Sequence, residues 1–259
     1  MTLNKDLDQA IYSVSEDALR QISEAEHQQI EELIGRINSG LGPFFYLFYD
    51  HQSQNILHIS EKCEELTGHP PSAWYEHGPT LFTDLFATEV KQEVLCQSDI
   101  CWQKVKTLSD ETKVRSSIVF RFTVQHNEHC RHFLNQHVIV TTGNNGTIKL
   151  CLAVFTDISH LKDMTDQRQV FSSVSISGDQ QHFVYNTVNG RLIDLNNLTK
   201  REKQVLAGYG SGKHTERIAD ELSISPYTIQ THRSKLYKKT GCKNLAELIH
   251  FAHANSVMQ

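Results

Sequence analysis

Residues 198–249 read LTKREKQVLAGYGSGKHTERIADELSISPYTIQTHRSKLYKKTGCKNLAELI. This stretch carries the start and stop signals of four consecutive helices. Thr199, followed three residues later by Glu202, forms a capping box that predicts the start of the first helix, and the glycines at positions 208 to 212 predict its end. Thr215 is the expected cap of a short second helix.

The third helix has the clearest boundaries. Ser225 and Pro226 are its expected cap and first residue, because proline has no N–H to lose at that position, and Gly241 predicts its end. Asn244, followed by Glu247, predicts the start of the fourth helix. Two short helices joined by the tripeptide SIS, of which the second is basic, predict a helix-turn-helix.

The two faces of the third helix differ in chemistry. Ile229 and Leu236 lie seven residues apart and share the side expected to face the core, with His232 and Arg233 beside them. The opposite side carries Tyr227, Gln230, Thr231, Ser234, Lys235 and Lys238. Residues 226–243 hold five basic side chains and no acidic one. Such a stripe is suited to the major groove of DNA.

Charge is divided unevenly along the chain. Residues 199–259 carry 10 Lys and Arg against 5 Asp and Glu, a net charge of +5, whereas residues 1–198 carry 15 against 25, a net charge of −10. A basic module on an acidic body is expected where one end of a protein meets a polyanion. Double-stranded DNA is therefore the leading candidate partner.

The motifs TKREKQVL, RIADELSIS, TIQTHRSKLYKKTG and NLAELI, with the glycine before Lys213, resemble the LuxR-type DNA-binding family over residues 198–259. The resemblance implies a transcriptional regulator that binds promoter DNA, with RNA polymerase as a further partner if it activates. From the resemblance and the basic stripe together, we expect DNA contacts from Lys213, His214, Thr215, Ser225, Tyr227, Thr228, Gln230, Thr231, His232, Arg233, Ser234, Lys235, Lys238 and Lys239.

The resemblance also implies separate roles within this set. Gln230, Thr231 and Ser234 with Lys235 occupy the base-facing side, whereas Thr228 and His232 with Lys239 resemble positions that contact the DNA backbone or orient the helix. Two positions depart from the family pattern: Gln230 stands where many members have Lys, and Thr240 stands where an apolar residue is usual. The preferred DNA sequence therefore cannot be copied from any relative.

The fourth helix of this family commonly makes the dimer contact on DNA. This implies an interfacial role for Leu245, Leu248, Ile249 and Ala252. The alternative is that these residues only close the core of the domain.

Residues 41–162 predict an α+β domain. The β-rich runs are FFYLFYD (44–50), ILHIS (56–60), SIVFRFTVQ (117–125), RHFLNQHVIVTT (131–142) and IKLCLAVFTDI (148–158). Helical stretches separate the second run from the third. The turns HNEH and GNNG separate the last three runs, which predicts an antiparallel meander.

This order of elements, with ISEKCEELTGH (59–69) and FTDISHLK (155–162), resembles the PAS family. The resemblance implies an antiparallel five-stranded sheet with helices, acting as a sensory or dimerisation module and forming a homodimer. Some PAS domains hold haem, a flavin or a small metabolite. We therefore expect a small-molecule ligand in this domain, and the sequence names no cofactor.

Several side chains are possible cofactor or metal ligands, but no pattern among them identifies a particular cofactor. HCRHFLNQ (129–136) superficially resembles the signature of flavin-binding photoreceptor PAS domains, but Cys130 lies inside the meander instead of on a helix before it. His126, His129, Cys130 and His132 gather soft metal ligands near one turn, where exposed histidines are a sufficient alternative. An axial haem ligand could come from His58, His69 or His77, and no pattern prefers one of them. We expect no metal.

The remaining segments complete the expected organisation. Residues 1–40 place apolar side chains at steps of three and four, which predicts an amphipathic helical segment that covers the next domain or pairs with a second copy. Residues 163–197 are polar and are expected to be a linker, in which VFSSVSI and HFVYN could pair as a hairpin. No apolar run could span a membrane and no signal peptide is evident, so the sequence predicts a cytoplasmic chain with free thiols.

These observations predict a one-component transcriptional regulator and not an enzyme. No GxSxG, P-loop, HExxH or dinucleotide-binding motif is present, and GYGSGK follows no predicted strand. The alternative function is a helix-turn-helix used for protein–protein interaction in a signalling scaffold, with the PAS-like domain as sensor. That alternative leaves the five basic side chains of the third helix unexplained.

Overall fold

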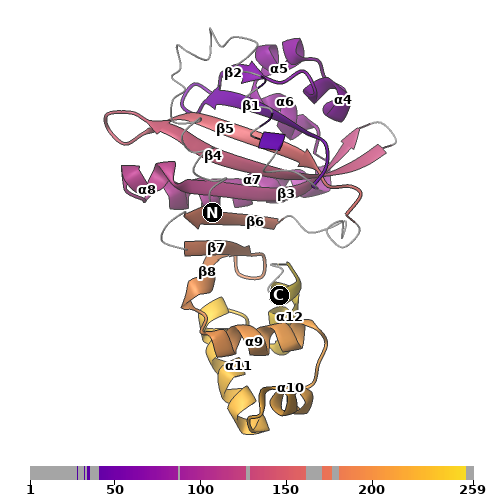
Figure 1. The fold of residues 1–259 in the computed structure, drawn as a ribbon, viewed down its shortest axis with the longest axis vertical. Coiled ribbons are helices and arrows are strands. Elements are labelled where there is room, and N and C mark those ends of the chain that lie inside the picture. Colours follow the sequence, from indigo (N-terminus) through magenta and orange to yellow (C-terminus); the bar gives the residue numbers. More distant parts are fainter. Residues whose placement is uncertain are drawn as a thin grey trace. The chain divides into compact units, whose positions relative to one another are not determined.

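In the computed structural model, the described residues are 41–86, 88–126, 129–161, 171–176 and 181–254, together with Gln28, Glu32, Ile34 and Gly35. The chain forms two compact units, which divide between Val170 and Phe171 (Figure 1).

The first unit is built on an antiparallel sheet. Its strands lie in the order β2-β1-β5-β4-β3. Their bounds are β1 Phe44–Asp50, β2 Ile56–Ile59, β3 Ser116–His126, β4 His129–Thr142 and β5 Ile148–Asp157. All five predicted runs are strands, with ends that differ by two residues at most. The five-stranded prediction concerned residues 41–162; the described chain contains eight strands, and the other three belong to the second unit.

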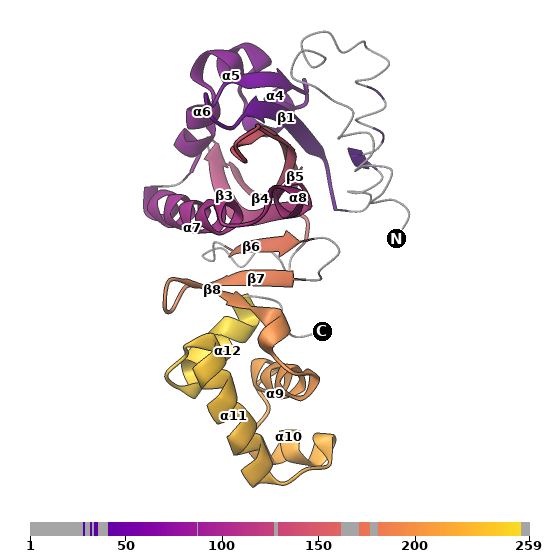
Figure 2. The ribbon, with the colours of Figure 1, turned by 90° about the vertical axis from the view of Figure 1, so that its left-hand side faces the viewer.

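Helices between β2 and β3 cover one face of this sheet (Figure 2). They are α4 Cys63–Thr67, α5 Pro71–His77, α6 Pro79–Asp84, α7 Thr88–Lys106 and α8 Asp110–Val114. Strand alternation separates two layers of apolar side chains. Leu47 and Tyr49 face these helices, whereas Tyr46 and Phe48 belong to a cluster on the other face, which also contains Ile34.

The second unit combines a small sheet with a helix-turn-helix. The strands β6 Phe171–Ile176, β7 Gln181–Asn186 and β8 Arg191–Asp194 pair antiparallel in chain order. A short 3₁₀ helix (Leu195–Asn197) follows, and then α9 Lys200–Gly210, α10 Thr215–Leu222, α11 Pro226–Thr240 and α12 Leu245–Ala254. Part of the expected linker is thus built of strands. The β6–β7 hairpin was expected, whereas β8 was not.

Local capping positions the helices largely as the sequence predicts. Thr199 and Glu202 form the reciprocal capping box of α9, and Ser225 accepts a hydrogen bond from the amide of Thr228 with Pro226 in the first turn. Gly241 ends α11 in a left-handed conformation with φ of 75°. These caps satisfy helix-terminal groups that would otherwise lack partners.

The expectation for the end of α9 was confirmed, whereas the one for the start of α10 was wrong. α9 ends at Gly210, within the predicted glycines 208 to 212, and Gly208 lies inside the helix. Gly208 instead permits close packing, since a Cβ there would lie 2.8 Å from the side chain of Ile218 on α10. Thr215 is not the cap of α10. His214 holds that position, and the Thr215 hydroxyl lies 3.0 Å from the hydroxyl of Tyr209.

Some expectations fall outside the described residues. The residues of the apolar stripe predicted within 1–40 lie outside the described residues; Ile34, which is described and is not part of that stripe, is 2% exposed and packs in the core of the first unit. The side chains at 125–130, including Cys130, are not described. Within the described part of the chain, no helix is long and apolar enough to cross a membrane.

Candidate nucleic-acid interface and internal cavity

Helix α11 presents the predicted polar stripe to the outside of the second unit. Its core side is buried, with Ile229 and Leu236 both 0% exposed. The side chain of Tyr227 is 78% exposed on the opposite side. Further exposed residues on the helix are Gln230, Thr231, Ser234, Lys235 and Lys238. The structure therefore brings the predicted base-facing residues together on one accessible surface.

The cations of this surface are not neutralised by the protein. Among the described residues, Lys235, Lys238 and Arg233 have no carboxylate within ion-pair distance. The hydroxyls of Thr231 and Ser234 donate back to helix carbonyl groups at 3.1 and 3.0 Å. Their lone pairs remain available as hydrogen-bond acceptors. The surface thus combines free positive charge with adaptable polar groups.

Other predicted contact residues have structural duties. Ser225 and Thr228 cap the start of α11, with their hydroxyls 2.8 Å apart. Lys213 pairs with Glu221 at 2.6 Å, and Arg217 pairs with the same carboxylate. His232 and Arg233 are half-buried beside the core side. Exposed His214 precedes the first turn of α10, which has no side-chain cap.

Lys239 was expected either to contact the DNA backbone or to orient the helix, and its contacts within the protein favour the second role. Its ammonium group donates to the Glu202 carboxylate at 2.7 Å and to the carbonyl of Asn197 at 2.7 Å. Burial alone would raise the pKa of Glu202, but the hydrogen bonds from Lys239 and Thr199 outweigh it and lower the pKa. Lys239 therefore joins α11 to α9, and the free ammonium group near the end of α11 is that of Lys238.

The C-terminus of α11 is held by the turn between β7 and β8, which the sequence did not predict. Asn186 and Asn189 both donate side-chain hydrogen bonds to the carbonyl of Thr240, at 2.9 and 2.8 Å. Thr240 is itself 0% exposed, and its hydroxyl donates to the carbonyl of Leu236. The polar groups of Thr240 therefore have partners, which explains why a polar residue is tolerated where the LuxR-type family usually has an apolar one.

Burial divides the four residues of α12 that were expected at a dimer contact. Leu248 and Ala252 are both 0% exposed and belong to the core of the second unit, so neither can reach a partner chain. Leu245 and Ile249 are partly buried against the same core. Only these two retain accessible surface for an interface, and the core-closing alternative holds for the other two.

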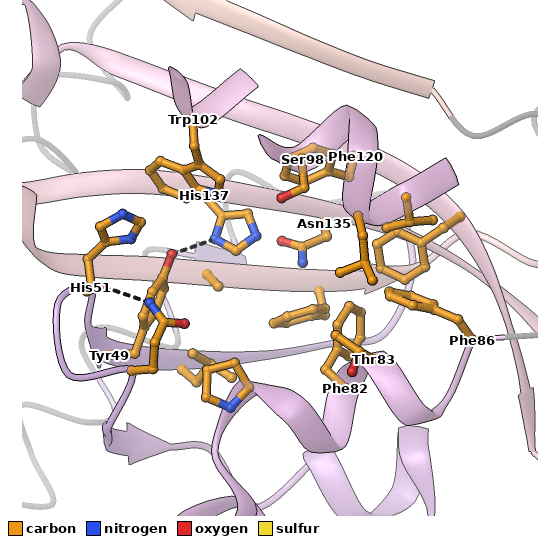
Figure 3. A pocket seen from close by; sticks show the side chains of 18 of the residues that line it. Tyr49, His51, Phe82, Thr83, Phe86, Ser98, Trp102, Phe120, Asn135 and His137 are labelled. Carbon is orange, nitrogen blue, oxygen red and sulfur yellow. Dashed lines mark hydrogen bonds between the residues drawn. The ribbon is translucent and has the colours of Figure 1, made fainter. Parts of the chain in front are cut away.

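The first unit encloses a cavity of about 350 Å³ between its sheet and helices α5, α6 and α7 (Figure 3). Eight of its lining residues are aromatic: Tyr49, Trp74, Phe82, Phe86, Trp102, Phe120, Phe122 and Phe155. His58, His69 and His77, the histidines considered for haem, do not line it. No group of three or more metal-ligating side chains occurs among the residues described.

A small polar cluster interrupts the aromatic lining. Asn135 and His137 lie side by side on one wall in Figure 3, and the Tyr49 hydroxyl lies 3.0 Å from His137 Nδ1. Burial, with a contribution from the neighbouring His51, lowers the pKa of His137 to about 3. The imidazole is therefore neutral at physiological pH, and the interior of the cavity is polar at one place without being charged.

Comparison with known proteins concerns the second unit. Residues 196–252 match the model of the luxR family of bacterial regulatory proteins. The transcriptional regulatory protein UhpA of Salmonella typhimurium is 45% identical over 53 residues, which cover 20% of this chain and 27% of UhpA. MctR of Rhizobium johnstonii is 31% identical over 97 residues, covering 36% of this chain and 45% of MctR.

The matched segments span less than half of either relative. A solved structure of the Vibrio cholerae VqmA dimer covers 88% of this chain and 92% of its own, with 15% identity and a TM-score of 0.34, which is too low to support a structural argument. The family match and the capped helices agree on the same segment. The C-terminal part of the chain is therefore a LuxR-type helix-turn-helix DNA-binding domain.

Proposed function

We propose that the chain is a one-component, sequence-specific transcriptional regulator that binds promoter DNA as a homodimer. Its second unit reads DNA with α11, and its first unit is a PAS-like sensory domain. The observation that carries the proposal is the exposed face of α11, where Gln230 lies on the same helix as Lys235 and Lys238, which have no carboxylate within ion-pair distance among the described residues. Like charges on one surface repel each other, and binding of a polyanion such as DNA would relieve this repulsion.

The residues of the exposed face of α11 have two proposed roles: contact with base edges and contact with phosphate groups. Gln230 has an amide that can donate and accept at once, which matches the edge of an adenine in the major groove. Lys235 and Lys238 carry unpaired ammonium groups that attract phosphate. The amides at the uncapped start of α10 are a further place for a phosphate. Phosphate contacts set the register, and base contacts set the sequence.

The first unit supports the sensory half of the proposal by its architecture. A five-stranded antiparallel part with the order β2-β1-β5-β4-β3 and helices on one face agrees with the PAS-like prediction. The cavity between the sheet and the helices offers a place for a ligand. A ligand that binds one arrangement more tightly shifts the population of DNA-competent dimers by its difference in affinity.

Selection from a pool of randomised duplexes tests the proposal. The full chain should enrich a sequence with two-fold symmetry, whose half-sites are centred about 10 base pairs apart, because two symmetric recognition helices read one groove face. A Gln230→Ala, Lys235→Ala double variant should lose the enrichment. Lys203→Ala removes an exposed cation from α9 and is the matched control. Enrichment of no sequence by the wild-type chain would contradict the proposal.

A further inference from the structure

We propose that the cavity of the first unit binds a small, uncharged, planar aromatic compound that carries an N–H or O–H donor, and that Asn135 recognises this donor. The inference rests on the proposed function, in which the first unit is the sensory part, and it names the chemical class of the ligand. Size, charge and hydrogen-bonding pattern each support it separately.

The walls determine the shape and size of the ligand. Phe82 packs against Phe155 with ring centroids 4.6 Å apart, and Phe122 lies 5.0 Å from Phe82 in the same way. Aromatic walls favour planar aromatic ligands, which can stack or meet ring edges. Ligand pockets range from about 300 to 1,000 Å³, so a cavity of about 350 Å³ is at the small end. It suits one ring or two fused rings.

The electrostatics of the lining exclude charged ligands. Among the described lining residues, Asp99 is the one carboxylate, and it is exposed. Burial keeps His137 neutral, and burial, with Lys106 nearby, also lowers the pKa of His51. A charged ligand would therefore lose its hydration without gaining an opposite charge in the cavity, which makes its binding unfavourable. An uncharged ligand avoids this cost.

Asn135 supplies the specific contact. The residue is 2% exposed, and its Oδ1 has no hydrogen-bond partner among the described residues. Its neighbours in register on the adjacent strands are Phe120 and Phe155, so it interrupts an aromatic row. A buried acceptor without a partner destabilises the fold, and an apolar residue at this position would avoid that cost. A donor on the ligand would satisfy it.

Trp74 adds a complementary group on the same cavity. It is 0% exposed, and its Nε1 also lacks a partner among the described residues. Because the indole N–H only donates, it would pair with an acceptor on the ligand. The rim residues Gln54, Leu95 and Asp99 are exposed, which leaves a path from solvent beside α7. The cavity is thus accessible and offers an acceptor and a donor to one guest.

Three probes separate the features of the ligand when they are titrated calorimetrically into the full chain. Indole is planar, uncharged and carries one N–H donor, N-methylindole lacks the donor, and indole-3-acetate adds a charge. Indole should bind saturably. N-methylindole should bind about tenfold more weakly, which corresponds to one hydrogen bond, and indole-3-acetate should not bind. Equal affinities for indole and N-methylindole, or no saturable binding of indole, would overturn the proposal.

An Asn135→Leu variant gives a second readout that needs no ligand. Both tryptophans, Trp74 and Trp102, lie in the first unit, so tryptophan fluorescence follows unfolding of this unit alone. The variant should raise the midpoint of thermal unfolding, because it removes an unpartnered buried acceptor, and should abolish the preference for indole. Gln136→Leu, the next position on β4 and on its other face, should retain the preference.

A lower midpoint for Asn135→Leu together with an unchanged preference for indole would show that Asn135 has only a structural role and would overturn the proposal. The proposed function fails separately: it would be contradicted by absence of sequence-selective DNA binding in the wild-type chain. Asn135→Leu should retain that DNA binding, since Asn135 belongs to the first unit and α11 to the second.

Discussion

At the scale of single residues, the exposed face of α11 carries side chains with different duties. Gln230 can read a base, whereas Lys238 can only neutralise a phosphate. Both are exposed and neither is needed for the core. Their substitution should therefore change DNA binding without changing the stability of the second unit.

Gln230→Ala should cost about 1–3 kcal/mol on the selected duplex and relax discrimination at one base pair, with little change in non-specific affinity. Lys238→Ala should weaken binding to every duplex alike and reduce the salt slope by about one per monomer, because one fewer counterion is released. Fluorescence anisotropy with selected and scrambled duplexes at several salt concentrations measures both effects. An equal loss on both duplexes for Gln230→Ala would refute its base-reading role.

Lys239→Ala should instead destabilise the second unit, by about 1–3 kcal/mol at neutral pH, because Glu202 is buried and would lose a charged partner. The pKa of Glu202 is lowered in the folded state, so its contribution is complete above its ordinary value of 4.5 and is lost as the pH falls through the lowered value. The difference between wild type and variant should therefore shrink below that pH. Denaturant unfolding followed by far-UV circular dichroism at pH 7 and pH 4 measures the difference in the free energy of unfolding between wild type and variant at each pH.

His137 should make the stability of the first unit dependent on pH. Its pKa is about 3 in the folded state and 6.5 ordinarily, so the unfolded chain binds the additional proton between these values. Stability should fall on acidification through this window, by at most about 1.4 kcal/mol per pH unit from this residue. His137→Gln should make the dependence shallower in tryptophan fluorescence. An unaltered slope would show that His137 takes up no proton on unfolding.

At the scale of elements, the turn between β7 and β8 acts as a second cap for α11. Helix C-termini leave carbonyl groups without partners, and two asparagine side chains here reach one of them. Gly241 permits this approach, because a Cβ at that position would collide with Asn189. The recognition helix is therefore fixed at its end by residues more than 50 positions earlier in the chain.

Asn186→Ala should destabilise the second unit by about 1–3 kcal/mol, because Asn186 is buried, the carbonyl of Thr240 would lose one of its two side-chain donors, and the amide of Val188 would lose its acceptor. Asn189→Ala should cost less, since Asn189 is partly exposed. Val188→Ala, in the same turn but 39% exposed, is the matched control and should change stability by less than about 0.5 kcal/mol. Denaturant titrations followed by far-UV circular dichroism report all three.

The elements also show which signals a sequence contains. Strands β1 to β5 were predictable because apolar alternation and turn residues are local patterns. Strand β8 has four residues and too short a pattern to detect. The pairs Lys239–Glu202 and Asn186–Thr240 join residues 37 and 54 positions apart, and no local pattern encodes such distances. Thr240 gave one available signal, since a polar residue at an apolar position requires a partner.

The cavity had a similar signal that the sequence reasoning missed. On β4, Phe133 and Ile139 are buried on the face of the sheet that the helices cover. Asn135 and His137 lie between them at every second position, and therefore on the same face. Two polar residues in an otherwise buried row indicate a site, because burial without a partner is unfavourable. Their relation to Tyr49 and Trp74 depends on the packed fold, which the sequence pattern does not specify.

At the scale of the whole molecule, two-fold symmetry is the central expectation. Leu248 and Ala252 are removed from the expected interface by burial, so α12 offers little apolar surface to a partner. The full chain should nevertheless sediment as a dimer at tens of micromolar without DNA, held outside α12. Leu245→Ser with Ile249→Ser should leave the dimer intact. Analytical ultracentrifugation checks this, and a monomer at that concentration would contradict it.

The anchoring of α11 by Asn186 and Asn189 has an evolutionary consequence. Val184 on β7 and Ile193 on β8, the two strands of the β7–β8 hairpin, lie in the same apolar cluster as the helix-turn-helix residues. A recombination event that joined a new sensor at residue 198 would discard these side chains and open the core. A crossover before Phe171 would transfer the hairpin with the helices as one inheritable module. Descendants of this chain that exchange sensors should therefore share a junction upstream of β6.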